Sequence, residues 1–263
     1  MSLFKVTMLI MIFTSSTLIA EKWNINVGAG VCESTASGRI TSTLNGTLYL
    51  QDNLVNDTSL YHGYFYISVE HPLPILPNIR FEYVEYTATG TSTDVGITSS
   101  SSLTGSTTFS NTFNSNLSMK QYDTILFYNL LDKDNWITLD LGLDLKYLLS
   151  DYTIDSIAQS SDSSVIPMVY VRGRVDIPDL DVGFESDTKY ITDGSSTVYD
   201  LRVKIDYTMT FIPVIHPGIE LGYRVEQFTS VSDKNSLIGP ILANATDTDI
   251  GFSGLYGGMN IKF

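Results

Sequence analysis

Cysteine, histidine and long apolar segments are all scarce in this chain. Of its 263 residues one is a cysteine, Cys32, which has no second thiol for an internal disulfide. Three are histidines, and none has partners at metal-ligand spacing, so the sequence predicts no metal or cofactor site. Beyond the N-terminus no segment is apolar and long enough to cross a bilayer as a helix. These absences argue against a disulfide scaffold, a motif-based metalloprotein and a bundle of membrane helices.

Basic residues are also few. The chain has 15 lysines and arginines against 29 aspartates and glutamates, which gives a formal net charge of −14. A protein that neutralises phosphates needs a basic stripe or patch. We therefore expect no nucleic-acid partner.

The N-terminal segment has the pattern of a secretory signal peptide. Residues 1–20 carry one lysine, then an apolar run, then small residues that end at Ala20. Cleavage after Ala20 leaves residues 21–263 as the exported domain. Cys32 lies well beyond the apolar run, so we expect a buried or loop thiol there and not a lipid-modified cysteine.

The exported domain is dominated by alternation of apolar and polar residues. In residues 136–147, WITLDLGLDLKY, every second residue from Ile137 to Tyr147 is apolar, while Asp140, Asp144 and Lys146 lie on the other face. Runs of about ten residues with period two are the length of tilted membrane-spanning strands. Ten such segments are predicted, at 23–31, 61–71, 78–88, 119–130, 136–149, 165–176, 179–190, 198–211, 218–228 and 251–263.

The connections between these segments alternate in length. The short ones are HPLPILP, LLDKD, IPDL and IPVIHPG, and the long ones, rich in Ser, Thr, Asn, Asp and Gly, are 32–60, 90–118, 150–164, 191–197 and 229–250. This alternation is typical of outer-membrane barrels. The predicted fold is all-β, a transmembrane antiparallel up-and-down β-barrel of ten strands with short periplasmic turns and long external loops. Residues 44–50 can form a further hairpin or helix, and eight or twelve strands remain alternatives.

Two features favour a membrane barrel over a soluble one. The closing strand places Leu255, Met259, Ile261 and Phe263 on one face and ends on an aromatic residue, the expected insertion signal for the barrel-assembly machinery. Aromatic residues also gather at strand ends, as in interfacial girdles. They are Tyr61, Tyr64, Tyr128, Tyr147, Tyr190, Tyr199, Phe211 and Phe228. We expect a monomer in the outer membrane of a Gram-negative bacterium, with outer-membrane lipid and lipopolysaccharide as its partners.

Several stretches together resemble one bacterial family over most of the exported domain. They are EHPLPILPNIR, FYNLLDKDNWITLDLGLDLKYL, VIPMVYVRGRVDIP, GIELGYR and FSGLYGGMNIKF, which contains Gly257 and Gly258. The family is that of outer-membrane barrel proteins named for a Gly-Gly pair near the C-terminus. The resemblance implies fold and location, and it implies neither an activity nor catalytic residues.

The polar faces of the strands predict a charged lumen. Its expected members are Glu70, Arg80, Glu82, Asp140, Asp144, Lys146, Arg172, Arg174, Asp176, Asp181, Glu185, Asp200, Arg202, Lys204, Asp206, Glu220, Arg224 and Glu226. Because buried charges must be paired, we expect a network that fills the lumen, with a narrow pore for small solutes as the alternative. Glu70 and Arg80 leave the first short turn on neighbouring strands, and we expect them to pair at the barrel floor.

Catalytic candidates are weak. His62 begins a strand near the external rim with Asp57 close in sequence, which leaves a rim-located hydrolase as a second alternative. Four loop aspartates could hold a divalent cation or bridge lipopolysaccharide, although solvated loop charge is the simpler interpretation. They are Asp155, Asp162, Asp247 and Asp249. We assign no catalytic residue and expect a non-enzymatic structural or interaction protein.

Overall fold

The computed structural model is a closed antiparallel β-barrel. It describes residues 23–42, 46–49, 60–73, 75–92, 113–131, 136–154, 158–177, 180–211, 214–231 and 245–263. The predicted signal peptide therefore lies outside the described residues. The described part of the chain contains no helix that is long and apolar enough to span a bilayer.

The described residues contain eleven strands, of which ten form the wall and pair in chain order. The strands are β1 (Asn24–Ser42), β2 (Gly46–Tyr49), β3 (Leu60–Glu70), β4 (Asn78–Ser92), β5 (Phe113–Leu131), β6 (Ile137–Ile154), β7 (Ala158–Ile177), β8 (Val182–Thr192), β9 (Thr197–Thr208), β10 (His216–Val231) and β11 (Ala245–Lys262). β11 pairs with β1 and so closes the barrel, whereas β2 is a short hairpin strand that pairs with the end of β1. The predicted ten-stranded barrel is confirmed.

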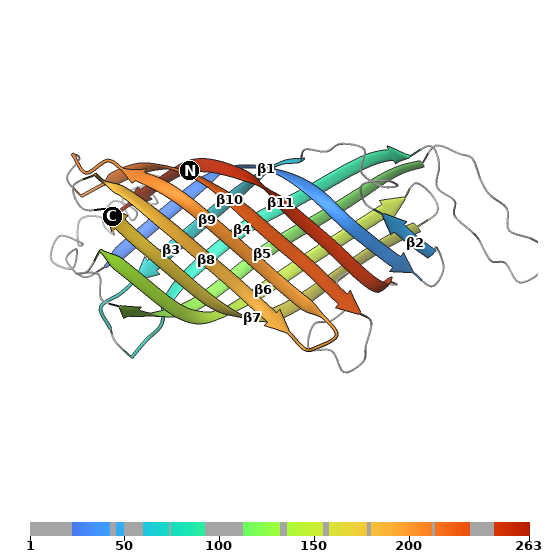
Figure 1. Ribbon diagram of the computed structural model, residues 1–263, viewed down its shortest axis with the longest axis horizontal. Helices are drawn as coiled ribbons and strands as arrows, with labels where there is room; N and C mark the ends of the chain where they lie inside the picture. The colour runs from blue at the N-terminus through green and yellow to red at the C-terminus, as the bar shows by residue number, and fades with distance from the viewer. Residues whose placement is uncertain are drawn as a thin grey trace, which may run out of the picture.

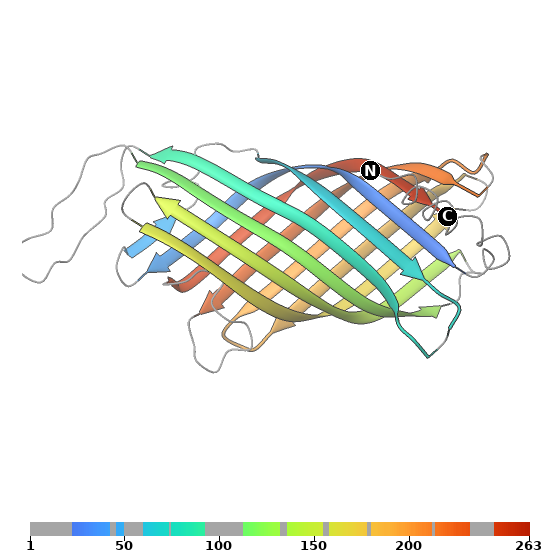
Figure 2. The same cartoon turned by 180° about the vertical axis from the view of Figure 1, so that it is seen from behind.

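The strands run at a steep tilt around an elongated barrel (Figure 1). β2 lies at one end and the C-terminus at the other, which is also the end of the short turns. We call these the long-connection end and the short-turn end. The view from behind shows the opposite side of the same wall (Figure 2).

Several strands are longer than predicted, mostly toward the long-connection end; β10 is also longer by two residues at the short-turn end. β1 continues to Ser42, β5 begins at Phe113 and β7 begins at Ala158. The predicted connection 150–164 is thereby wrong, because all of its described residues, 150–154 and 158–164, lie in strands. The added residues are mainly Ser, Thr, Asn and Asp, so they lack the apolar outward face from which period two was recognised. At about 3.3 Å per residue, strands of this length reach well past an apolar band of about 25 Å.

At the short-turn end two predicted strands are too long by more than one residue. The strand predicted at 198–211 ends at Thr208, and residues 210 and 211 lie in the turn that follows it. Residues 180 and 181 belong to the turn before β8, which begins at Val182. Asp181 is exposed there with a φ of +55°, and its backbone oxygen accepts a hydrogen bond from Thr208 N. Asp181 is therefore a turn residue and not a member of the lumen set.

Large apolar side chains cover the outward face in a band around the barrel. Leu143, Leu221 and Met259 are 65%, 58% and 72% exposed. On the long-connection side the band ends in a row of tyrosines, in which the Tyr83 and Tyr122 ring centroids lie 5.0 Å apart. A soluble barrel would not leave so much apolar surface in water, so this band is the surface that a bilayer covers.

The predicted girdle is correct in part. Tyr61, Tyr128 and Tyr190 are exposed on the outward face. Tyr64 and Phe228 instead point into the lumen, where Phe228 is wholly buried. Each lies on the same face of its strand as the charged residues. An aromatic residue near a strand end therefore does not by itself mark the membrane interface.

The glycine pair in the last strand has two different surroundings. Gly258 lies opposite Gly30 across the β1–β11 seam, and a Cβ on Gly258 would come within 2.4 Å of both Ala29 O and the Tyr64 hydroxyl. A Cβ on Gly257 would point outward, with no atom nearer than 3.6 Å. The seam therefore needs glycine at 258 and does not need it at 257.

This difference gives a matched test of the seam. We expect Gly258→Ala to destabilise the barrel by about 2 kcal/mol, because backbone atoms of β1 would have to move. Gly257→Ala should change stability by no more than about 0.5 kcal/mol. Urea-unfolding midpoints of the two variants in detergent would measure this, and equal effects would contradict the assigned facing of the pair.

Candidate functional site: the charged lumen

The structure places nearly all of the predicted lumen residues inside the barrel. Arg80, Lys146 and Asp200 are at most 1% exposed, and Asp176 stands at the open short-turn end with 53% of its side chain exposed. Asp144 is also fully buried, yet neither of its carboxylate oxygens accepts a hydrogen bond from a described residue. The remaining members of the set are buried or nearly so and take part in the contacts that follow.

Lys189, on β8, lies at the centre of the network. Its Nζ donates to Glu82 Oε2 of β4 at 2.6 Å and to the Asp123 carboxylate of β5, and it lies 3.3 Å from Asp200 Oδ2 of β9. Strands β8 and β4 are separated around the wall by β5, β6 and β7. Lys189 therefore links strands that are not neighbours in the sheet.

Lys146, on β6, crosses the lumen in the same way. Its Nζ donates to Glu226 Oε1 of β10 at 2.8 Å and to Gln121 Oε1 of β5 at 2.8 Å. Lys146 Nζ also donates to Asp123 Oδ2 at 3.2 Å, and Lys189 Nζ donates to the same oxygen. The two ammonium groups thus form one continuous cluster with the carboxylates around them.

Guanidinium groups extend this cluster along the wall. Arg202 donates to Asp187 Oδ1 at 2.8 Å and to Glu82 Oε1 at 2.5 Å. Arg224 forms a two-pronged contact with Asp200, with distances of 2.9 and 2.7 Å. Paired bonds of this kind hold both side chains in one geometry and offset the cost of burying the charges.

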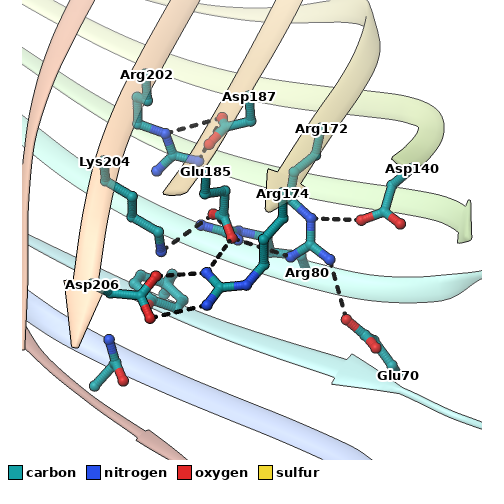
Figure 3. A network of polar contacts seen from close by, with 12 residues as sticks. Glu70, Arg80, Asp140, Arg172, Arg174, Glu185, Asp187, Arg202, Lys204 and Asp206 are labelled. Atoms are coloured by element: carbon teal, nitrogen blue, oxygen red, sulfur yellow. Dashed lines mark hydrogen bonds and ion pairs between the residues drawn. The ribbon is translucent and has the colours of Figure 1, made fainter. Parts of the chain in front are cut away.

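A second cluster fills the lumen toward the short-turn end (Figure 3). Arg174 reaches between Asp206 Oδ1 at 2.5 Å and Glu185 Oε2 at 3.3 Å. Arg172 donates from Nε to Asp140 Oδ2 at 2.5 Å. Neighbouring strands thus carry interlocking pairs of opposite sign.

The predicted pair between Glu70 and Arg80 is wrong. Arg80 donates to Glu82 Oε1 at 2.5 Å, and Glu70 Oε1 instead accepts from Arg172 Nη2 at 3.2 Å. In the β3–β4 register Arg80 lies opposite Ser68, so Glu70 is two residues nearer the turn than the residue that faces Arg80. Arg80 therefore pairs with a carboxylate further inside the lumen, that of Glu82, whereas Glu70 pairs with Arg172 on a distant strand.

Glu220 is held by hydroxyl groups as well as by charge. Tyr64 and Tyr66 donate to its two oxygens at 2.6 and 2.9 Å, and Lys204 Nζ lies 3.2 Å from Oε2. These bonds connect β10 with β3 across the β1–β11 seam. The inward aromatic residues therefore belong to the polar network.

The sequence interpretation missed several members of the network, among them Lys189, Asp187, Asp123 and Gln121. Lys189 and Asp187 share the parity of Glu185, and that parity alone would have found them. Asp123 and Gln121 share a face with Ile125 and Phe127, which are both fully buried inside the barrel. The inward face of β5 thus carries both polar and apolar residues. The alternation of polar and apolar residues along β5 therefore does not identify which face points inward.

Toward the long-connection end the lumen is apolar, which corrects the prediction of a polar interior throughout. Tyr86 stacks on Phe252 with ring centroids 4.1 Å apart, within a cluster of buried inward-facing side chains. The cluster comprises Ala36, Ile40, Leu60, Val84, Tyr86, Ala88, Leu117, Met119, Leu148, Tyr152, Ile166, Met168, Val198, Phe228, Ile250 and Phe252. This part of the barrel is packed like the core of a soluble protein.

His62 lies inside the barrel and not at an open rim. It is 9% exposed, its ring centroid is 4.4 Å from that of Tyr86, and its cross-strand partner is Cys32. Neither ring nitrogen has a hydrogen-bond partner among the described residues, and Asp57 lies outside them. The geometry does not favour the hydrolase alternative.

The loop aspartates lie mostly on strands. Asp162 is on β7, while Asp247 pairs with Arg39 at 3.3 Å and Asp249 accepts a hydrogen bond from Gln227. Asp155 is outside the described residues. Within the described ranges, no three His, Cys, Asp or Glu side chains gather in a way that could hold a metal ion.

Two solved structures match the chain over most of its length, at low similarity. No protein-family model matches the chain, and no curated protein matches it. Among solved structures, the outer membrane protease OmpT from Escherichia coli matches with 12% identity and a TM-score of 0.43, over 93% of this chain and 97% of OmpT. Neisserial surface protein A (NspA) matches with 12% identity and a TM-score of 0.37, over 91% of this chain and 97% of NspA. At these values no residue role or activity is transferred to this chain.

Proposed function

We propose that this protein is a closed, non-enzymatic outer-membrane barrel with a structural or interaction role. The observation that carries the proposal is the filled lumen, in which Lys146 and Lys189 join opposite walls and an apolar layer lies beyond them. The short turns face the periplasm, and the long-connection end projects from the cell. Lipopolysaccharide and outer-membrane lipid surround the apolar band.

The projecting parts of the strands support an interaction role. Their outward faces carry small polar residues, such as Thr87 and Thr89 on β4 and Ser161 and Ser163 on β7. We assign recognition by the assembly machinery to four exposed residues at the end of the chain, Leu255, Met259, Ile261 and Phe263. Membership of the Gly-Gly family belongs to the same proposal.

The pore alternative needs a path that the packing opposes. The cavity beside Cys32, Arg202 and Arg224 in mid-lumen has a volume of about 20 Å³. That is room for about one water molecule, since one water needs at least about 10–15 Å³ of such volume. A hydrated ion would have to displace several buried ion pairs to pass.

Planar-bilayer recording tests the closed lumen. We expect the folded protein to give no conductance steps above those of the bare membrane, because its buried ion pairs and apolar layer block the lumen. Heat-modifiable gel migration of the reconstituted sample confirms that folded barrels are present, and an open porin serves as the positive control. Regular steps from the folded protein would contradict the proposal and favour a solute pore.

A further inference from the structure

The turn between β3 and β4, residues 71–77, carries large apolar side chains on its surface. Leu73, Ile75 and Leu76 are 52%, 85% and 54% exposed. The turn extends sideways from the short-turn end, away from the barrel axis (Figure 2). A soluble protein rarely leaves such a group of side chains in water, so a partner covers them.

A hydrogen bond places this turn beside the apolar band. The backbone oxygen of Ile75 accepts from the Tyr128 hydroxyl at 3.0 Å. Tyr128 is 45% exposed on the outward face of β5, where Leu126 and Leu130 are 42% and 55% exposed. The turn therefore leans outward over β5, and its apolar side chains continue the surface that the bilayer covers.

The backbone of the turn is also suited to a surrounding without water. Residues 72, 74 and 77 are prolines, which have no N–H to satisfy. The N–H of His71 donates to Asn78 Oδ1 at 2.9 Å, and that of Leu73 donates to His71 Nδ1 at 3.2 Å. The same ring donates from Nε2 to the backbone oxygen of Pro77 at 3.0 Å. Because polar backbone groups in lipid need partners within the protein, these bonds favour a lipid surrounding over water.

We propose that the β3–β4 turn binds lipid, with Leu73, Ile75 and Leu76 among the acyl chains of the adjacent leaflet. Tyr128 holds the turn against the outer wall. Moving the turn into water would expose all three side chains again, so the turn also fixes the depth of the barrel in the bilayer. That this leaflet is the periplasmic one rests on the proposed function. Insertion itself can be measured in vesicles, whichever way the barrel points.

Tryptophan fluorescence in vesicles tests the proposal. Trp23 and Trp136 are replaced by phenylalanine, a single tryptophan is introduced as Ile75→Trp, and the barrel is reconstituted in phosphatidylcholine brominated on one acyl chain. Tyr128→Trp probes the apolar band in the same background, and Ser161→Trp probes the projecting part of β7. We expect the lipid to quench Ile75→Trp as strongly as Tyr128→Trp, and aqueous iodide to quench it at least about fivefold less than Ser161→Trp.

Two outcomes would overturn the proposal, and they are distinguishable. If iodide quenched Ile75→Trp as strongly as Ser161→Trp while the lipid still quenched Tyr128→Trp, the turn would stand in water, open to a protein partner, and the proposed function would be unaffected. If the lipid failed to quench Tyr128→Trp as well, the assignment of the apolar band to the bilayer would fall, and the proposed function with it.

A further pair of variants tests the role of Tyr128. Tyr128→Phe, added to the Ile75→Trp protein, removes the hydroxyl that holds the turn, and we expect quenching by the lipid to fall about twofold. Tyr207→Phe is the matched control, since Tyr207 is 42% exposed on β9 at the same end of the barrel. It should leave the quenching unchanged. A loss in both variants, or in neither, would refute Tyr128 as the residue that holds the turn.

Discussion

Replacing Lys189 by methionine is expected to lower the free energy of unfolding by about 3–5 kcal/mol. The substitution keeps the length of the side chain and removes its charge. Glu82, Asp123 and Asp200 would then remain buried with one cation fewer among them. A buried carboxylate that loses its cation has no water to compensate it, so the folded state bears the cost.

A lysine on the outer surface provides the control. Lys120 lies 3.6 Å from Glu85, and the two side chains are 41% and 36% exposed. Lys120→Met should cost no more than about 1 kcal/mol, because solvent screens the pair. Urea titration in detergent, followed by fluorescence of Trp23 and Trp136, measures both variants. A Lys189 variant as stable as the Lys120 variant would show that the central cluster does not stabilise the barrel.

The second large effect is expected from Phe252→Ala in the apolar layer of the lumen. Phe252 is 2% exposed and stacks on Tyr86, so its removal leaves a cavity between packed side chains. Loss of a buried phenylalanine costs about 3–5 kcal/mol. The same urea titration applies, with the midpoint and slope recorded for each variant.

Phe184 is the matched residue on the outside of the wall. It is 47% exposed and faces the apolar band, where detergent or lipid chains replace a deleted ring. Phe184→Ala should therefore cost about 1 kcal/mol or less. If Phe184→Ala proved the more damaging change, the assignment of inward and outward faces would have to be reversed.

The sequence alone determined the class of fold and which face of most strands carries charge. Apolar residues alternate strictly from Ile137 to Tyr147, as in a β-strand. Asp140, Asp144 and Lys146 must therefore all lie on the opposite face. The alternation of long and short connections then favoured ten strands over eight or twelve. These are local properties, and they do not depend on where the barrel closes.

Strand ends and the facing of β5 were less predictable. Beyond the bilayer the described outward residues of β7 are Ser161 and Ser163, so the contrast that marks a strand disappears although the pairing continues. On β5 the inward face mixes Asp123 with Ile125 and Phe127, and amphipathicity cannot orient such a strand. The pattern assumes an apolar outward face in lipid and a polar inward face. The first condition fails on β7 beyond the bilayer, and the second fails on β5.

Only the tertiary structure decided which charges meet. Glu70 and Arg80 leave the same turn, yet Glu70 pairs with Arg172 of β7 and Arg80 with Glu82. Contacts across a lumen depend on the register of every strand pair between them and on closure through β1 and β11. Alternation along one strand specifies that a side chain points inward. Its partner depends on the registers of all the intervening strand pairs, and no single segment of the sequence contains that information.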